Sequence, residues 1–186
     1  MIIVFIGPPF AGKDTQAVML SKKLSLSLFS MGGLIREARE KGDKVIEDAY
    51  RNYSLKGLHL PIGIKFGLLR KKIENLNDGF ILNNFPATNE DLQVFNEYLK
   101  EHNLSVYKAF YLNISKNIMQ KRLDASTRKR SDDDLKIILA RREIQDKDRI
   151  PVINYFRNLG ILEEVDGERE IDEVNKDILS RLRKIT

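Results

Sequence analysis

The sequence predicts an α/β fold in which helices cover both faces of a parallel sheet. Short apolar runs alternate with segments of helical periodicity, and the first apolar run leads into a glycine-marked loop. This alternation is typical of parallel strands joined by crossover helices. No internal repeat, low-complexity stretch or linker divides the 186 residues, so we expect one domain.

Five apolar runs predict the strands. Residues Ile2–Ile6 are all apolar and partly β-branched, as expected for a buried parallel strand. The other predicted strands cover 28–30, 79–82, 106–114 and 161–165.

Helical spacing of apolar residues predicts the segments between the strands. Ala17, Val18, Leu20 and Leu24 recur at this spacing and predict a helix over 13–24. Similar patterns predict helices over 32–41, 45–53, 89–101, 116–123 and 171–182. Pro61 is expected in the first turn of another helix, and the Ser and Asp residues at 131–134 are expected to cap a further one.

Composition narrows the function classes. No run of about 18 apolar residues predicts a membrane span, and the N-terminus has no basic region typical of a secretory signal. The absence of cysteine excludes disulfides and thiolate metal sites and fits a reducing, cytoplasmic compartment. His59 and His102 have no partner at ligand spacing, which argues against a histidine metal site.

The net charge of +5 is compatible with nucleic acid, an acidic membrane surface or a phosphate-rich small molecule. Because 32 basic and 27 acidic residues are interspersed, the charge argues against nucleic acid as a partner. Nothing in the sequence indicates an interface, so a monomer is expected.

A phosphate-binding loop is the strongest single motif. It lies between the first predicted strand and helix, where backbone N–H groups and the helix N-terminus can hold phosphates. Its residues are Gly7, Pro8, Pro9, Phe10, Ala11, Gly12, Lys13, Asp14 and Thr15. Lys13 is expected to reach the β and γ phosphates of ATP, and the Thr15 hydroxyl to bind Mg²⁺. Asp14 separates these two residues, whereas the general motif has the hydroxyl directly after the lysine.

Several segments resemble the adenylate kinase (nucleoside monophosphate kinase) family, in order along the chain. Residues 7–16 are similar to its Gly-Pro-Pro-x-Ala-Gly-Lys-x-Thr-Gln loop, 30–36 to Ser-Thr-Gly-Asp-Leu-Leu-Arg, and 79–88 to Gly-Phe-Ile-Leu-Asp-Gly-Phe-Pro-Arg-Thr. Residues 130–133 resemble Arg-x-Asp-Asp, with Arg141 eleven residues after Arg130 as in the family. Residues 151–153 and 165–167 match its C-terminal segments.

The resemblance implies a P-loop NTPase fold of three layers with a five-stranded parallel sheet. It also implies an insertion that binds the nucleoside monophosphate (NMP), at about 30–72, and a short lid at about 122–131. The implied activity is transfer of the γ-phosphoryl group of ATP to an NMP with Mg²⁺, as a transferase of nucleotide biosynthesis. Its catalytic residues would be Lys13, Arg122, Arg130 and Arg141. A further lid arginine is replaced by Ser126, for which Arg128 is a candidate substitute.

The acceptor side departs from the family pattern. By position, the resemblance assigns acceptor binding to Met31, Arg36, Leu58, Leu60, Asn84, Ala87 and Asp91. Of these, Ala87 stands where the family has a phosphate-binding arginine, and Asp91 where a glutamine reads adenine. Met31, Gly33 and Asn84 are further departures.

The ATP side has fewer departures. Asn83 replaces an aspartate that orders the water shell of Mg²⁺, while Phe10 and Asp14 replace loop glycines. Phe10 is expected to be harmless if its side chain points outward. Asp14 places a negative charge near the phosphates, though the first helical turn favours it.

Three functions stay open on these observations. The first is an NMP kinase with a changed acceptor preference, and the second is an ATP-binding pseudokinase, favoured by Ala87 and Asn83. The third is another P-loop role linked to nucleic acid, whose signature would be steeply salt-dependent oligonucleotide binding.

Overall fold

The computed structural model describes residues 1–76, 78–126 and 134–182. These residues form a sheet of five parallel strands in the order β2-β3-β1-β4-β5, which confirms the predicted fold class. The strands are β1 (Ile2–Ile6), β2 (Ser27–Ser30), β3 (Phe80–Asn83), β4 (Val106–Asn113) and β5 (Leu162–Asp166). Each predicted strand is present, with its ends moved by at most one residue.

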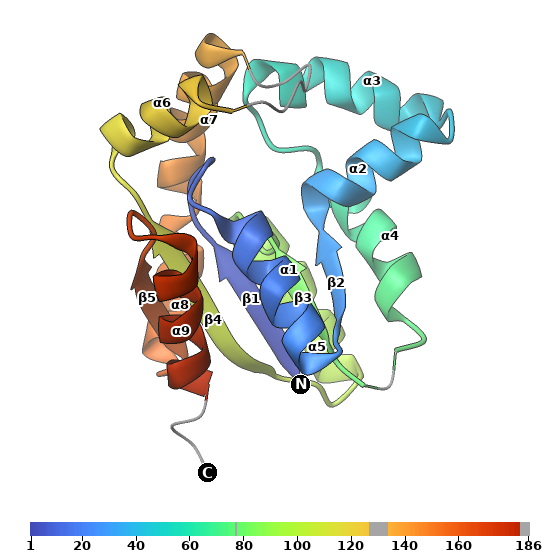
Figure 1. Ribbon diagram of the computed structural model, residues 1–186. Helices are drawn as coiled ribbons and strands as arrows, with labels where there is room; N and C mark the ends of the chain where they lie inside the picture. The colour runs from blue at the N-terminus through green and yellow to red at the C-terminus, as the bar shows by residue number, and fades with distance from the viewer. Residues whose placement is uncertain (77, 127–133, 183–186) are drawn as a thin grey trace.

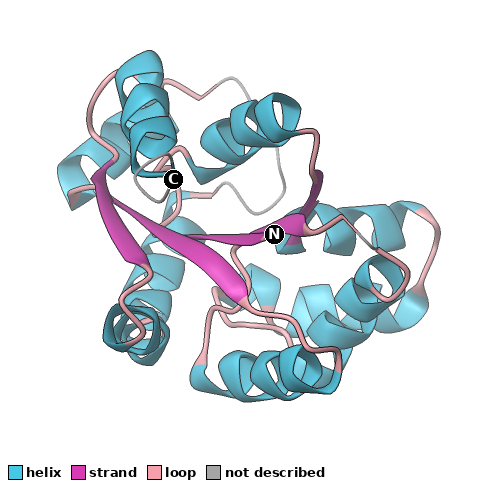
Figure 2. Ribbon diagram, turned by 90° about the horizontal axis from the view of Figure 1, so that it is seen from below, coloured by secondary structure: helices cyan, strands magenta, loops and turns pink. Residues whose placement is uncertain are grey.

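Helices cover both faces of the sheet (Figures 1 and 2). They are α1 (Lys13–Leu24), α2 (Met31–Glu40), α3 (Lys44–Asn52), α4 (Ile62–Ile73), α5 (Asn89–Glu101), α6 (Lys116–Asp124), α7 (Leu135–Asp148), α8 (Ile150–Asn158) and α9 (Ile171–Leu182). A short 3-10 turn, η1 (Ser54–Lys56), follows α3. In these described segments no helix is long and apolar enough to cross a membrane.

Alternation along the strands divides the core into two layers. Ile3 and Phe5 of β1 pack in a cluster with α1, α6, α7 and α9. Ile2, Val4 and Ile6 pack in a second cluster with α2 to α5 and α8. Successive side chains of a strand point to opposite faces, so an apolar strand such as β1 is covered on both sides.

Two helix starts differ from the predictions. Pro61 is the N-cap of α4 with extended backbone angles (φ −51, ψ 141), so it precedes the first turn instead of lying in it. Helix α8 was not predicted, and it begins directly after α7 with Pro151 in its first turn. A proline there costs no hydrogen bond, because the first N–H groups of a helix have no partner within it.

The N-cap of α7 is Asp134, the last residue of the predicted capping segment 131–134. Asp134 accepts a hydrogen bond from the N–H of Lys136 at 2.8 Å. The rest of the predicted capping segment, 131–133, lies outside the described residues, as do Arg128 and Arg130 and so half of the predicted lid.

Gly57 allows close contact between η1 and α7. Its φ is +77°, and a Cβ at this position would lie 2.8 Å from the backbone nitrogen of Arg141. Gly42 has an equivalent φ of +78°, but a Cβ there would meet no atom within 4 Å. The two glycines therefore share the backbone requirement, while the tight contact exists only at Gly57.

We predict that Gly57→Ala lowers the free energy of unfolding more than Gly42→Ala does. Gly42→Ala, the control, should lower the free energy of unfolding by about 1 kcal/mol, because alanine is strained in the left-handed backbone conformation. Gly57→Ala should lose about 1–3 kcal/mol more, because Ala140 and Arg141 must move. Urea denaturation of both variants measures the difference, and equal losses would show that the contact is not tight in solution.

Candidate active site

The carboxyl ends of the parallel strands meet at one edge of the sheet, and the phosphate-loop residues lie there. Gly7 follows β1 with φ +149°, and a Cβ on it would lie 2.3 Å from the carbonyl oxygen of Leu112 in β4. Gly12 is the N-cap of α1 with φ 86°. Both positions favour glycine, the first for close approach of two strands and both for their backbone angles.

Phe10 keeps the backbone shape of the glycine that it replaces. Its φ is 62°, in the left-handed region that costs a side-chain-bearing residue of order 1 kcal/mol. The Phe10 side chain does not point fully outward, because it is half-buried against the core cluster on the α1 face. This packing offsets part of the backbone cost.

A cavity of about 520 Å³ opens above the loop. Lys13, Asp14 and Thr15 at the start of α1 line it, as does Asn83 at the end of β3. The Lys13 ammonium lies over the loop and donates to the carbonyl of Pro8 at 2.7 Å. An N-terminal helix end with this lysine is a suitable site for phosphate groups.

Arg122 lines this cavity and joins the phosphate loop to the segment after β5. Its guanidinium donates to the carbonyl of Phe10 at 3.1 Å and to that of Glu168 at 3.3 Å. Arg122 therefore lies at the rim of the loop and lines the cavity above it.

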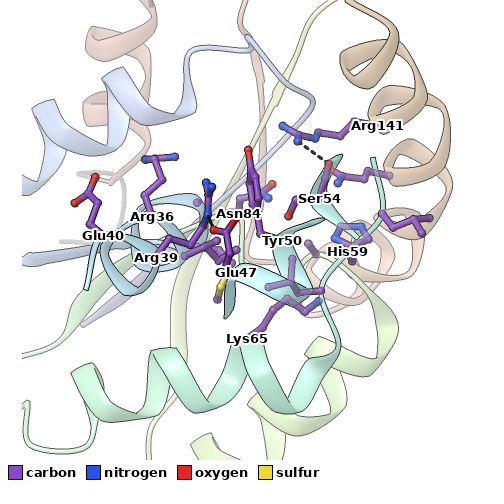
Figure 3. A pocket seen from close by; sticks show the side chains of 17 residues that line it. Arg36, Arg39, Glu40, Glu47, Tyr50, Ser54, His59, Lys65, Asn84 and Arg141 are labelled. Carbon is purple, nitrogen blue, oxygen red and sulfur yellow. Dashed lines mark hydrogen bonds and ion pairs between the residues drawn. The ribbon is translucent and has the colours of Figure 1, made fainter. Parts of the chain in front are cut away.

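A second cavity of about 460 Å³ lies between α2, α3, η1 and the start of α4 (Figure 3). Of the predicted acceptor residues, those that line it are Met31, Arg36, Leu58, Leu60, Asn84 and Ala87. Asn84 has φ 61°, so it adopts the left-handed conformation at a position where the family has glycine. Asparagine tolerates this conformation better than most residues do.

The two cavities share part of their lining. Gly32, Arg36, Asn84, Arg141 and Gln145 line both. Arg36 comes from α2, whereas Arg141 comes from α7 and donates to the carbonyl of Ser54 at 3.3 Å (Figure 3). Two guanidinium groups from distant parts of the chain thus stand where the cavities meet.

Asp91 does not line the second cavity. Its side chain is fully buried, lies 2.5 Å from the ammonium of Lys65, and accepts a hydrogen bond from the N–H of Ala87 at 3.0 Å. Lys65 in turn lines the cavity. The residue expected to read the acceptor base is therefore buried behind Lys65, and Lys65 is one of the charged residues at the cavity wall.

Three further residues of the α2–α3 wall were not predicted from the sequence. The Arg39 guanidinium lies 3.6 Å from the ring centroid of Tyr50, and its Nε is 2.6 Å from Glu47. Hydrogen bonds from Arg39 and then Arg51 hold the pKa of Glu47 below its usual range. The spacing of these residues is that of ordinary surface helices, so only the packing of α2 on α3 identifies them.

His59 also lines the second cavity and is largely buried. Burial, with further contributions from Lys65, Arg149 and Arg141, lowers its pKa to about 3. Its Nε2 lies 3.6 Å from Asp148, which is beyond hydrogen-bond distance. His59 is therefore neutral at physiological pH.

We predict that the His59 ring does not titrate between pH 8 and 5. The His59 imidazole takes up a proton near pH 6.5 in the unfolded chain and only near pH 3 in the folded chain. The free energy of unfolding should therefore decrease as the pH falls from about 6.5 to about 3, by up to about 1.4 kcal/mol per pH unit from this group. Ring-proton NMR shifts, assigned with His59→Gln, measure it; a midpoint near 6.5 would contradict the buried environment.

We predict that Asp91→Asn destabilises the fold by about 3–5 kcal/mol, because it leaves the buried ammonium of Lys65 without its carboxylate. The double variant Lys65→Met/Asp91→Leu should recover most of this loss. Denaturant unfolding compares the three proteins. Unchanged stability of Asp91→Asn, together with lost acceptor binding, would instead assign Asp91 to base recognition.

Comparison with known proteins gives one consistent result. The sequence model described as "Adenylate kinase" matches residues 5–161. The adenylate kinase of Archaeoglobus fulgidus is 28% identical, covering 100% of this chain and 99% of that protein. That of Leptospira biflexa is 29% identical (97% and 98%), and that of Prochlorococcus marinus 31% (97% of each). With its phosphate loop, two adjoining cavities and this match over most of its length, the chain belongs to the adenylate kinase family.

Proposed function

We propose that the protein is an ATP-dependent NMP kinase that catalyses ATP + NMP ⇌ ADP + NDP. The observation that carries this proposal is the pair of cavities that share Arg36 and Arg141. ATP would occupy the cavity above the phosphate loop, and the acceptor nucleotide the cavity between α2 and α4. The transferred phosphoryl group would then pass between two guanidinium groups.

Phosphoryl transfer requires positioning and charge neutralisation more than covalent chemistry. In this proposal Lys13 and the loop N–H groups hold the β and γ phosphates, while Arg122 contacts the nucleotide from the rim. Arg141 stabilises the charge that develops on the transferred group, and Arg36 holds the phosphate of the acceptor. Arg130 and the lid at about 122–131 remain predictions for closure that excludes water.

Mg²⁺ fits the residues around the loop. The Thr15 hydroxyl lines the cavity, and the buried side-chain oxygen of Asn83 has no hydrogen-bond partner within the described part of the protein. Hard oxygen ligands and water-mediated contacts of this kind suit Mg²⁺. When bound, the ion would neutralise the phosphate chain and hold it in one geometry.

Acceptor preference is the finer part of the proposal. Ala87 removes an arginine from the acceptor wall, and the Lys65–Asp91 ion pair occupies the position of a base-reading glutamine. A base would meet an ammonium there instead of an amide. We therefore propose an acceptor preference that differs from that of a typical adenylate kinase.

We predict ADP formation from Mg·ATP that depends on one particular NMP. A coupled assay would test AMP, CMP, UMP, GMP and their deoxy forms separately. Lys13→Ala and Arg141→Ala should each lower kcat/KM by about 10²–10³-fold, because each removes a cation from the charge that develops in transfer. Lys23→Ala, an exposed residue in the last turn of the same helix as Lys13, is the matched control and should be unchanged.

The same assay separates the rival function. No turnover with any NMP, together with retained ATP binding by calorimetry, would overturn the kinase proposal in favour of the pseudokinase. Steeply salt-dependent binding to oligonucleotides would instead point to nucleic acid.

A further inference from the structure

We propose that Asp14 is the carboxylate that holds Mg²⁺ in this protein, with Asn83 as its positioning partner. The inference rests on the proposed use of a Mg·nucleotide complex. It assigns a role to the residue between Lys13 and Thr15, which neither the general loop motif nor the family pattern explains.

The first observation is a direct contact between two unusual residues. The side-chain amide of Asn83 donates a hydrogen bond to Oδ1 of Asp14. Asp14 lies in the first turn of α1, whereas Asn83 ends β3, and the two are 69 residues apart in sequence. Both line the cavity above the phosphate loop.

The second observation is the state of the Asn83 side chain. Asn83 is only 1% exposed, and its Oδ1 has no hydrogen-bond partner among the residues that the structure describes. A buried carbonyl oxygen without a partner is uncommon and indicates a missing donor. A water molecule bound to Mg²⁺ is such a donor, because this ion usually keeps several of its waters in protein sites.

The position of Asp14 supports the same role. It directly follows the loop lysine, where the general P-loop motif presents a hydroxyl to Mg²⁺. Asp14 is exposed, so its carboxylate reaches the cavity while its partner Asn83 is buried. Carboxylate oxygen is a preferred ligand of Mg²⁺, either directly or through bound water.

The two departures from the family pattern then have one explanation. Asn83 lacks the negative charge of the aspartate that it replaces, and Asp14 adds a negative charge where the family has glycine. The hydrogen bond between them places the Asp14 carboxylate one contact away from the Asn83 side chain. In the proposal, the carboxylate of the site is therefore carried by α1 instead of β3.

A metal-binding role and a purely structural role of Asp14 predict different effects on nucleotide binding. A carboxylate beside the phosphate loop repels bound phosphate when no cation is present. Asp14 should therefore weaken metal-free nucleotide binding and strengthen metal-dependent binding. A hydrogen bond that only joins α1 to β3 would affect stability and leave the metal dependence of binding unchanged.

The test measures Mn²⁺ binding to the ADP-saturated protein by electron paramagnetic resonance, and ADP binding in EDTA by calorimetry. Neither readout needs turnover. The proteins are wild type, Asp14→Asn, Asp14→Gly, Asn83→Asp and the exchanged double variant Asp14→Gly/Asn83→Asp. Glu101→Gln is the charge control, since Glu101 is exposed at the end of α5, before β4 and away from the loop.

We expect Asp14→Asn and Asp14→Gly to weaken Mn²⁺ binding about 10–100-fold, the usual effect of losing such a partner. In EDTA they should bind ADP more tightly than wild type, because the repulsion between the Asp14 carboxylate and the phosphates is removed. The double variant should recover Mn²⁺ affinity to within about threefold of wild type, because it restores one carboxylate at the same contact. Glu101→Gln should match wild type in both measurements.

Unchanged Mn²⁺ affinity in Asp14→Asn would overturn the inference, as would a double variant no better than Asp14→Gly. Either result would leave the proposed kinase function intact if NMP-dependent turnover is present. Conversely, the metal effect without turnover would refute the kinase proposal alone. A wild-type protein that binds no ADP would refute both the kinase proposal and the Asp14 inference.

Thermal unfolding of each variant identifies any that fails to fold. If a variant does fail, the result for Asp14→Asn, which keeps the shape of the side chain, decides the test.

Discussion

The parallel pairing of β1 with its neighbours on both sides is the constraint on which the site depends. Because the strands run in one direction, their carboxyl ends meet at one edge, and the loops that follow them converge there. The phosphate loop follows β1, and Arg36 lies in the helix after β2. Asn83 is the last residue of β3, and Asn84 is the next residue along the chain. An antiparallel β3 would carry these asparagines to the opposite edge.

This convergence also determines the electrostatics of the site. Arg36 and Arg141 are distant in sequence, yet both line the two cavities. The backbone of η1 holds Arg141 through the carbonyl of Ser54, and Gly57 lets α7 approach closely enough for this contact. Two like charges repel each other, so their placement is favourable where a phosphate group lies between them.

Several departures from the family pattern form specific contacts within this protein. Asp91 pairs with Lys65, and Asp14 pairs with Asn83. Phe10 packs its ring against the core while it keeps a glycine-like backbone. In each case the unusual residue contacts a group from another part of the chain.

Local patterns in the sequence determined the strands, most helices and the phosphate loop. Apolar runs, helical spacing and glycine positions depend on neighbours close in the chain, and Ile2–Ile6 and Lys13–Leu24 are therefore found as predicted. The helix Ile150–Asn158 was missed because it follows α7 without a loop to mark its start.

Only the tertiary structure decided which side chains reach the cavities. The family resemblance placed Asp91 at the acceptor base and gave no role to Lys65, because the contact that buries one behind the other joins α4 to α5. The same limit applies to Asp14 and Asn83. Their departures from the family pattern look independent in the sequence, but the structure joins the two side chains by a hydrogen bond. Spacing along a chain predicts contacts within one element, whereas contacts between elements depend on how the helices pack on the sheet.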